Sequence, residues 1–110
     1  MRLPLGDTET SREAAVERYL HLTRVSLPNI AKSRGADWPV MNDHCFQRIV
    51  LDAICGAVWY DHIKRPAYKH MSSEQAGKAV QLCEEIIAGR ADLRQLNRQS
   101  LMFRGKPNAL

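Results

Sequence analysis

The longest apolar pattern in the chain predicts a buried central helix over about residues 43–63. Its apolar side chains recur at spacings of three and four residues, which is the period of an α-helix. One broad face carries Phe46, Ile49, Val50, Ala53, Ile54, Ala57 and Tyr60. Because Leu51 and Val58 widen that face, other helices are expected to surround this one. Asn42 or Asp43 is expected to cap its first turn.

The N-terminal third is expected to form a helix that is interrupted once. Thr10 and Glu13 make the Ser/Thr-x-x-Glu pattern of a capping box, which marks the start of a helix. Residues 1–9, ahead of that box, are expected to form a flexible arm. Pro28 cannot sit comfortably inside a helix, so a kink or a break is expected at residues 26–28.

Two more helices are expected after the central one. A second capping box, formed by Ser72 and Gln75, predicts a helix over residues 73–88. Asp92 can cap a last helix over residues 92–103. The segment that separates the first of these from the central helix contains a proline and is expected to be a turn.

The sequence therefore predicts an all-α fold, a single compact bundle of four to five helices around the central helix. A chain of 110 residues makes one domain, which is expected to span residues 10–105 and to be followed by a tail at residues 106–110. No internal repeat and no alternating strand pattern is present in the sequence. Short connections between the helices favour antiparallel neighbours.

Composition agrees with an ordinary globular protein, with 45% hydrophobic and 25% charged residues. The net charge of +4 permits a nucleic acid or an acidic protein as partner but requires neither. No signal peptide is visible, and the longest apolar run, residues 53–60, is far too short to span a membrane. A cytoplasmic protein without a membrane partner is expected.

The cysteine and histidine positions predict neither a disulfide nor a metal site. Cys45, Cys55 and Cys83 are odd in number and show no CxxC spacing, which is typical of free thiols in a reducing compartment. His44 and His62 would lie about 27 Å apart along one helix and could not share an ion. We expect no metal and no cofactor.

The start of the central helix is the first candidate binding site. Pro39 pushes Trp38 towards an extended conformation, from which it can lean over the first helical turn. His44 lies near free backbone N–H groups, and Arg48 adds a planar, permanently charged fork for a carboxylate or a phosphate. Asp52 completes this polar strip. The alternative is that Trp38 covers the core while Arg48 and Asp52, four residues apart, simply pair with each other.

A stripe of basic residues near the C-terminus is the second candidate. It consists of Arg90, Arg94, Arg98, Arg104 and Lys106, with amide side chains between them that can read base edges. The last two predicted helices could form a helix-turn-helix, although Glu85 falls where a small buried residue is wanted. The stripe therefore indicates nucleic-acid binding as an alternative function.

The leading interpretation is a small cytosolic helical module that binds or regulates a partner through protein–protein contacts. The partner is expected to be another protein, a second copy of the chain included, with nucleic acid as the alternative. A second alternative is a small transferase-like enzyme with a cleft at His44 and Arg48. Because the sequence contains neither a catalytic constellation nor a phosphate-binding glycine loop, an enzyme is the less favoured interpretation.

Overall fold

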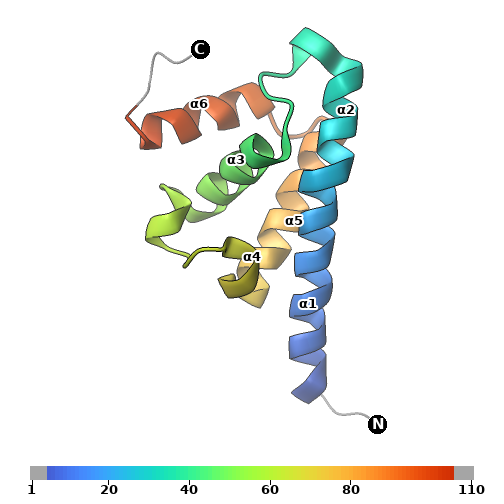
Figure 1. Ribbon diagram of the computed structural model, residues 1–110, viewed down its shortest axis with the longest axis vertical. Coiled ribbons are helices and arrows are strands. Elements are labelled where there is room, and N and C mark those ends of the chain that lie inside the picture. The colour runs from blue at the N-terminus through green and yellow to red at the C-terminus, as the bar shows by residue number, and fades with distance from the viewer. Residues whose placement is uncertain (1–4, 106–110) are drawn as a thin grey trace.

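The computed structural model describes residues 5–105, with the side chains from Ser11 onward apart from that of Ala36, and this part of the chain is helical without any strand (Figure 1). The elements are α1 (Leu5–His21), η1 (Leu22–Ser26), α2 (Leu27–Arg34), η2 (Gly35–Asp37), α3 (Asp43–Cys55), η3 (Trp59–Asp61), α4 (Ala67–His70), α5 (Ser73–Ala88) and α6 (Leu93–Phe103). The predicted all-α bundle is confirmed.

The first three elements form one continuous rod, and the expected interruption is a change of helix type. Residues 22–26 form a π-helical turn, and the N–H of Leu27 donates to the carbonyl of Leu22. Pro28 follows in the first turn of α2. A proline has no N–H to donate, and its ring crowds the carbonyl four residues before it. The wider π-helical turn relieves this crowding. The chain therefore passes residues 26–28 without a break.

The rod begins earlier than the first capping box indicates. α1 starts at Leu5, so Thr10 and Glu13 lie inside the helix. A Thr and a Glu three positions apart are also neighbours on the face of a continuous helix. The Thr-x-x-Glu spacing alone therefore does not show that a helix starts there. The predicted arm is thus wrong for residues 5–9, and residues 1–4 lie outside the described part of the chain.

α3 is the central helix, but it is shorter than predicted. Phe46, Ile49 and Val50 are completely buried in it, and it packs against η1, α5 and α6. It ends at Cys55 because Gly56 adopts the left-handed conformation, with φ of 67°, that glycine adopts readily at a helix C-terminus. The predicted helix is therefore wrong for residues 56–63, which leave α3 through the short turn η3.

The remaining helix starts are confirmed. The Ser72 hydroxyl accepts from the N–H of Gln75 at 3.0 Å, and the Gln75 side chain accepts from the N–H of Ser72 at 2.8 Å. Asp92 caps α6 through the backbone N–H groups of Arg94 and Gln95. The predicted turn before α5 contains one extra helical turn, α4.

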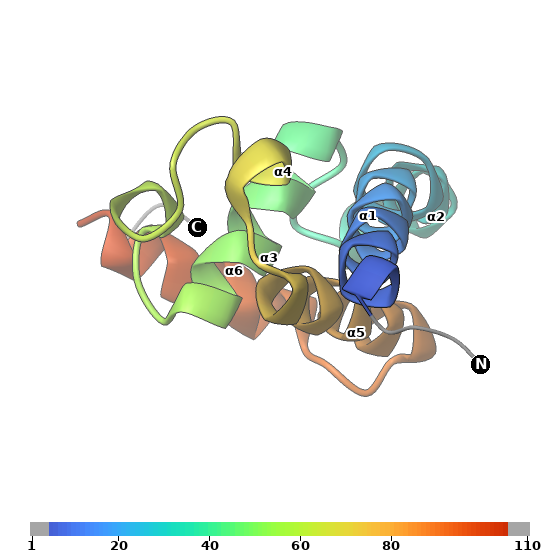
Figure 2. The ribbon, with the colours of Figure 1, turned by 90° about the horizontal axis from the view of Figure 1, so that it is seen from below.

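The helices form two pairs. α1 packs along α5, and α3 packs beside α6 (Figure 1 and Figure 2). α3 joins the pairs because it contacts α5 and η1 as well as α6. None of the helices within residues 5–105 combines the length and the apolar character that crossing a membrane requires.

All three cysteines are free thiols. Cys83 lies in α5 with no exposed surface. Burial, with a smaller contribution from the negative charge of Glu84, raises the pKa of Cys83 to about 12. Its neutral thiol therefore acts as part of the core.

Replacing Phe46 tests whether α3 is the centre of the core. Phe46→Ala removes a completely buried ring and should lower the free energy of unfolding by about 3–5 kcal/mol. Urea denaturation followed by circular dichroism measures the change. Met41→Ala is the control because Met41 is 50% exposed, and it should change little. Equal effects of the two substitutions would contradict the packing described.

The buried thiol predicts a loss of stability at alkaline pH. In the unfolded chain Cys83 ionises near its ordinary pKa of 9.0, whereas in the folded protein it ionises at about 12. Stability is therefore fully present below pH 9 and falls by about 1.4 kcal/mol per pH unit between these values. Urea midpoints of wild type and Cys83→Ala from pH 8 to 10.5 should diverge, with the variant falling less. Parallel curves would refute the assignment.

Candidate functional site

The carboxylate of Asp52 is completely buried in α3 and joins three segments. Arg104, just after α6, donates from Nε to Oδ2 at 2.9 Å and from Nη2 to Oδ1 at 3.0 Å. The Ser100 hydroxyl donates to Oδ2 at 2.6 Å. The backbone N–H of Trp59, in η3, donates to Oδ1 at 2.9 Å. One carboxylate thus holds α6 and the segment after α3 against the central helix.

Arg48 joins the same network without contacting the carboxylate. Its Nη1 donates to Ser100 Oγ at 2.7 Å, and its Nη2 donates to Asn97 Oδ1 at 2.8 Å. Ser100 therefore stands between Arg48 and Asp52. The simple Arg48–Asp52 pair considered from the sequence is not formed, because Arg104 occupies the carboxylate instead. The hydrogen bond to Asp52 is also the main reason why the pKa of Arg104 is raised.

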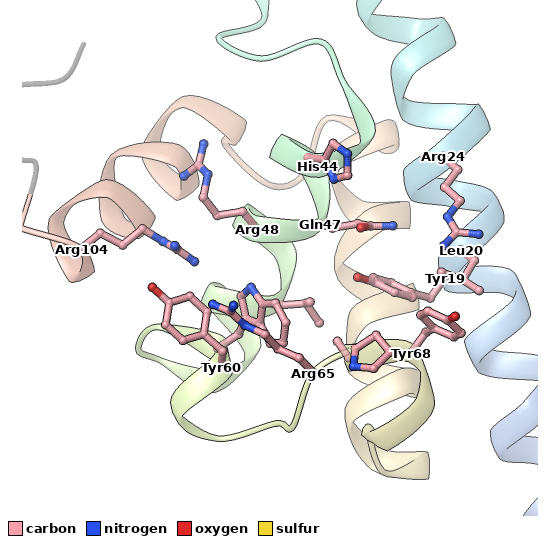
Figure 3. Close-up of a pocket in the computed structure, with 14 residues that line it drawn as sticks. Tyr19, Leu20, Arg24, His44, Gln47, Arg48, Tyr60, Arg65, Tyr68 and Arg104 are labelled. Carbon is pink, nitrogen blue, oxygen red and sulfur yellow. The ribbon is translucent and has the colours of Figure 1, made fainter.

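An open pocket with a volume of about 460 Å³ lies beside this network. Four arginines line it, each from a different segment: Arg24 from η1, Arg48 from α3, Arg65 from the loop before α4, and Arg104 from the end of α6. Arg48 and Arg104 approach from one side and Arg24 from the other, with Arg65 between them (Figure 3). Among the described residues that line the pocket there is no Asp or Glu.

Aromatic rings lie against three of these arginines. The guanidinium carbon of Arg65 lies 4.2 Å from the centre of the Tyr60 ring, and that of Arg104 lies 5.3 Å from it. Arg24 lies 5.7 Å from the Tyr68 ring. Cation–π contact of this kind holds a guanidinium in place without neutralising it. The pocket defined by these four arginines and two tyrosines is called the Arg/Tyr pocket below.

The four residues predicted at the start of the central helix are only partly brought together. His44 and Arg48 both line the Arg/Tyr pocket. The His44 side chain is 89% exposed, and its Nε2 is 3.9 Å from Asp43 Oδ1. Asp52 is completely buried and does not line the pocket. Trp38 packs edge-on against Phe46, with ring centres 5.8 Å apart. It therefore covers the core and does not line the Arg/Tyr pocket.

Trp38 borders a second, smaller hollow. This hollow has a volume of about 240 Å³ and lies between the end of α2 and the turn from α5 to α6. Arg34 lies over the Trp38 ring, with its guanidinium carbon 5.7 Å from the ring centre. Asp37 and Asp92 also line the hollow, so its charges are mixed.

The predicted C-terminal stripe is divided by the structure. Arg90, Arg94 and Arg98 are exposed, the first in the turn before α6 and the others on that helix. Arg104 is turned inward to Asp52, which removes it from the surface stripe. Lys106 lies outside the described residues.

The residues that the sequence interpretation missed are Arg24, Arg65, Tyr60 and Tyr68. A local signal was available, because residues 59–69 contain two tyrosines, a tryptophan, an arginine and two lysines within one short stretch. Their contribution was hidden because residues 59–63 were assigned to the central helix. Arg24 has no comparable signal, because it reaches the pocket only through the packing of η1 beside α3.

The described residues offer little for metal or thiol chemistry. Among the side chains that the structure describes, no group of three or more His, Cys, Asp or Glu is placed to hold a metal ion. Burial, followed by the negative charge of Asp52, raises the pKa of Cys55. A raised pKa disfavours the thiolate, which is the nucleophilic form.

Comparison of the chain with protein-family models, curated proteins and solved structures finds no match. The function is therefore inferred from the geometry of the pocket alone.

Replacing Asp52 tests the network. Asp52→Asn removes the charge that pairs with Arg104 and places an amide donor against other donors, so the free energy of unfolding should fall by about 3 kcal/mol or more. Asp61→Asn is the matched control, because Asp61 is exposed in η3. Urea denaturation of both variants measures the difference. A loss below about 1 kcal/mol for Asp52→Asn would show that the buried pair does not hold α6.

Proposed function

We propose that this protein is a small cytosolic binding module that recognises an anionic group of a partner protein in the Arg/Tyr pocket. The observation that carries the proposal is the set of four guanidinium groups around one hollow whose described lining includes no carboxylate. Such a module would act as a regulatory or accessory subunit.

The charge of the pocket is unbalanced. Arg104 is paired with Asp52, and Arg48 reaches the same carboxylate through Ser100. For Arg24 and Arg65, the contacts found within the described residues are with aromatic rings. Asp52 balances one of the four positive charges, and bringing the remaining three together is unfavourable unless a further counter-charge arrives. A negatively charged ligand would supply it.

The residue types favour a protein partner. Tyr, Trp and Arg are the residues that most often dominate the binding energy of protein interfaces. Tyr60 and Tyr68 are 41% and 36% exposed, so their rings are available for contact. Arginine also forms paired hydrogen bonds with a carboxylate or a phosphate.

Two alternatives are kept as outcomes of the test. Nucleic acid would use the exposed Arg90, Arg94 and Arg98, but this surface lacks Arg104. A transferase-like enzyme would use the pocket itself, with His44 as its proton carrier. Arginines orient and neutralise anions, so the pocket supports binding more directly than proton transfer.

The test compares two variants with equal loss of charge. The double variant Arg24→Ala/Arg65→Ala removes pocket arginines, whereas Arg90→Ala/Arg98→Ala removes exposed arginines outside it. The partner is captured from the source cells, purified and titrated against each variant by calorimetry. The pocket variant should bind at least about tenfold more weakly, which is about 1.4 kcal/mol. The matched variant should bind as the wild type does.

The opposite pattern would overturn the proposal. If only Arg90→Ala/Arg98→Ala weakens binding, the C-terminal stripe is the interface. If nuclease treatment abolishes capture, and binding of a purified oligonucleotide weakens steeply with salt, the nucleic-acid alternative replaces the proposal. Circular dichroism of each variant confirms that its fold is retained.

A further inference from the structure

The charge of the Arg/Tyr pocket exceeds what one carboxylate ligand could balance. Four guanidinium groups face the pocket, and the one carboxylate bonded to any of them within the described residues is that of Asp52. That carboxylate is completely buried behind Arg104 and Ser100, so a ligand cannot reach it. A ligand carboxylate brings a single negative charge. A phosphate monoester brings about 1.5 to 2 negative charges at neutral pH and three acceptor oxygens.

The positions of Arg24 and Arg65 leave guanidinium donors available. Arg65 lies over the faces of Tyr60 and Trp59, at 4.2 Å and 5.9 Å from the ring centres. A guanidinium group is planar, and its five N–H donors lie in that plane. Contact with a ring face therefore leaves donors at the edge for a ligand. Arg24, 5.7 Å from the Tyr68 ring, is held in the same way on the other side of the pocket.

The walls of the pocket favour an aromatic group attached to that phosphate. Tyr19, Trp59, Tyr60 and Tyr68 all line the pocket, and Leu20 and Leu51 add apolar surface. Aromatic rings pack well edge-on or offset against one another. The volume of about 460 Å³ falls within the range of pockets that enclose small ligands. The pocket therefore offers room for a flat ring as well as for an anion.

We infer that the ligand group is a phosphate monoester joined to an aromatic body, with Arg24 and Arg65 as its principal donors and the tyrosines beside the ring. This inference rests on the proposed function and specifies the group that the partner presents. A phosphotyrosyl side chain is the protein group with this chemistry. A nucleoside monophosphate, in which a sugar separates the phosphate from the aromatic base, is the competing source that the test must distinguish. Arg48 and Arg104, fixed by Asn97, Ser100 and Asp52, add positive charge from the opposite wall.

The two tryptophans make a direct test possible. Trp59 lines the Arg/Tyr pocket, and Trp38 lies outside it. In Trp38→Phe, Trp59 is the sole tryptophan and reports on the pocket by its fluorescence. Phenyl phosphate is the probe. Phenyl sulfate has nearly the same shape but one charge fewer, and inorganic phosphate lacks the ring. Calorimetry on the wild type provides a second measurement should Trp38→Phe be unstable.

Phenyl phosphate should change the Trp59 emission saturably and bind at least about tenfold more tightly than either control. Arg65→Ala should weaken its binding by about tenfold, and Arg98→Ala should leave it unchanged. A phosphotyrosine peptide and adenosine monophosphate then distinguish the two sources. Tighter binding of the peptide supports the inference, whereas tighter binding of the nucleotide would show that the group is not one that a partner protein presents and would overturn it.

Equal binding of phenyl phosphate and phenyl sulfate would overturn the inference, and so would binding that Arg65→Ala does not affect. These results would not overturn the proposed function, which is tested separately by the binding of the purified partner to Arg24→Ala/Arg65→Ala. An aromatic carboxylate, benzoate, that binds as tightly as phenyl phosphate would also sink the phosphate assignment while leaving an anion site in place.

Discussion

The buried carboxylate of Asp52 is the constraint on which the rest of the structure depends. A charge without exposed surface is costly unless hydrogen bonds and an opposite charge compensate it. Asp52 receives that compensation from Arg104, Ser100 and the backbone of Trp59. These partners belong to α6 and to the segment after α3, so satisfying one carboxylate also fixes where both segments lie.

The same network divides the pocket arginines into two kinds. Arg48 and Arg104 are held by hydrogen bonds to Asn97, Ser100 and Asp52, which makes them a preorganised wall. Arg24 and Arg65 are held by contact with ring faces, which fixes their direction less strictly. A ligand therefore meets a rigid positive wall on one side and adaptable donors on the other, and only the adaptable donors need to lose freedom on binding.

The sequence predicted the features whose causes are local. Ser72 and Asp92 were identified as caps, and Asn42 was one of the two candidates for the central helix, because capping joins residues two or three positions apart. The all-α class and the central position of α3 followed from the helical period of its apolar side chains. The pairing of Asp52 with Arg104 could not be predicted in this way, because 52 positions separate them. The sequence instead suggested the nearest available partner, Arg48.

The misplaced end of α3 and the missed pocket have one cause. Extending the central helix to residue 63 places Trp59 and Tyr60 on a straight helix, about 100° apart around its axis. Gly56 ends the helix instead, and the N–H of Trp59 then turns back to Asp52. That turn brings Tyr60 between Arg65 and Arg104 and so builds one wall of the pocket.

Interpreting Gly56 as the end of the helix would have revealed part of this wall from the sequence. Residues 59–69 would then have stood out as a separate segment that contains an arginine and two tyrosines. The position of Arg24 would still have required the packing of η1 against α3.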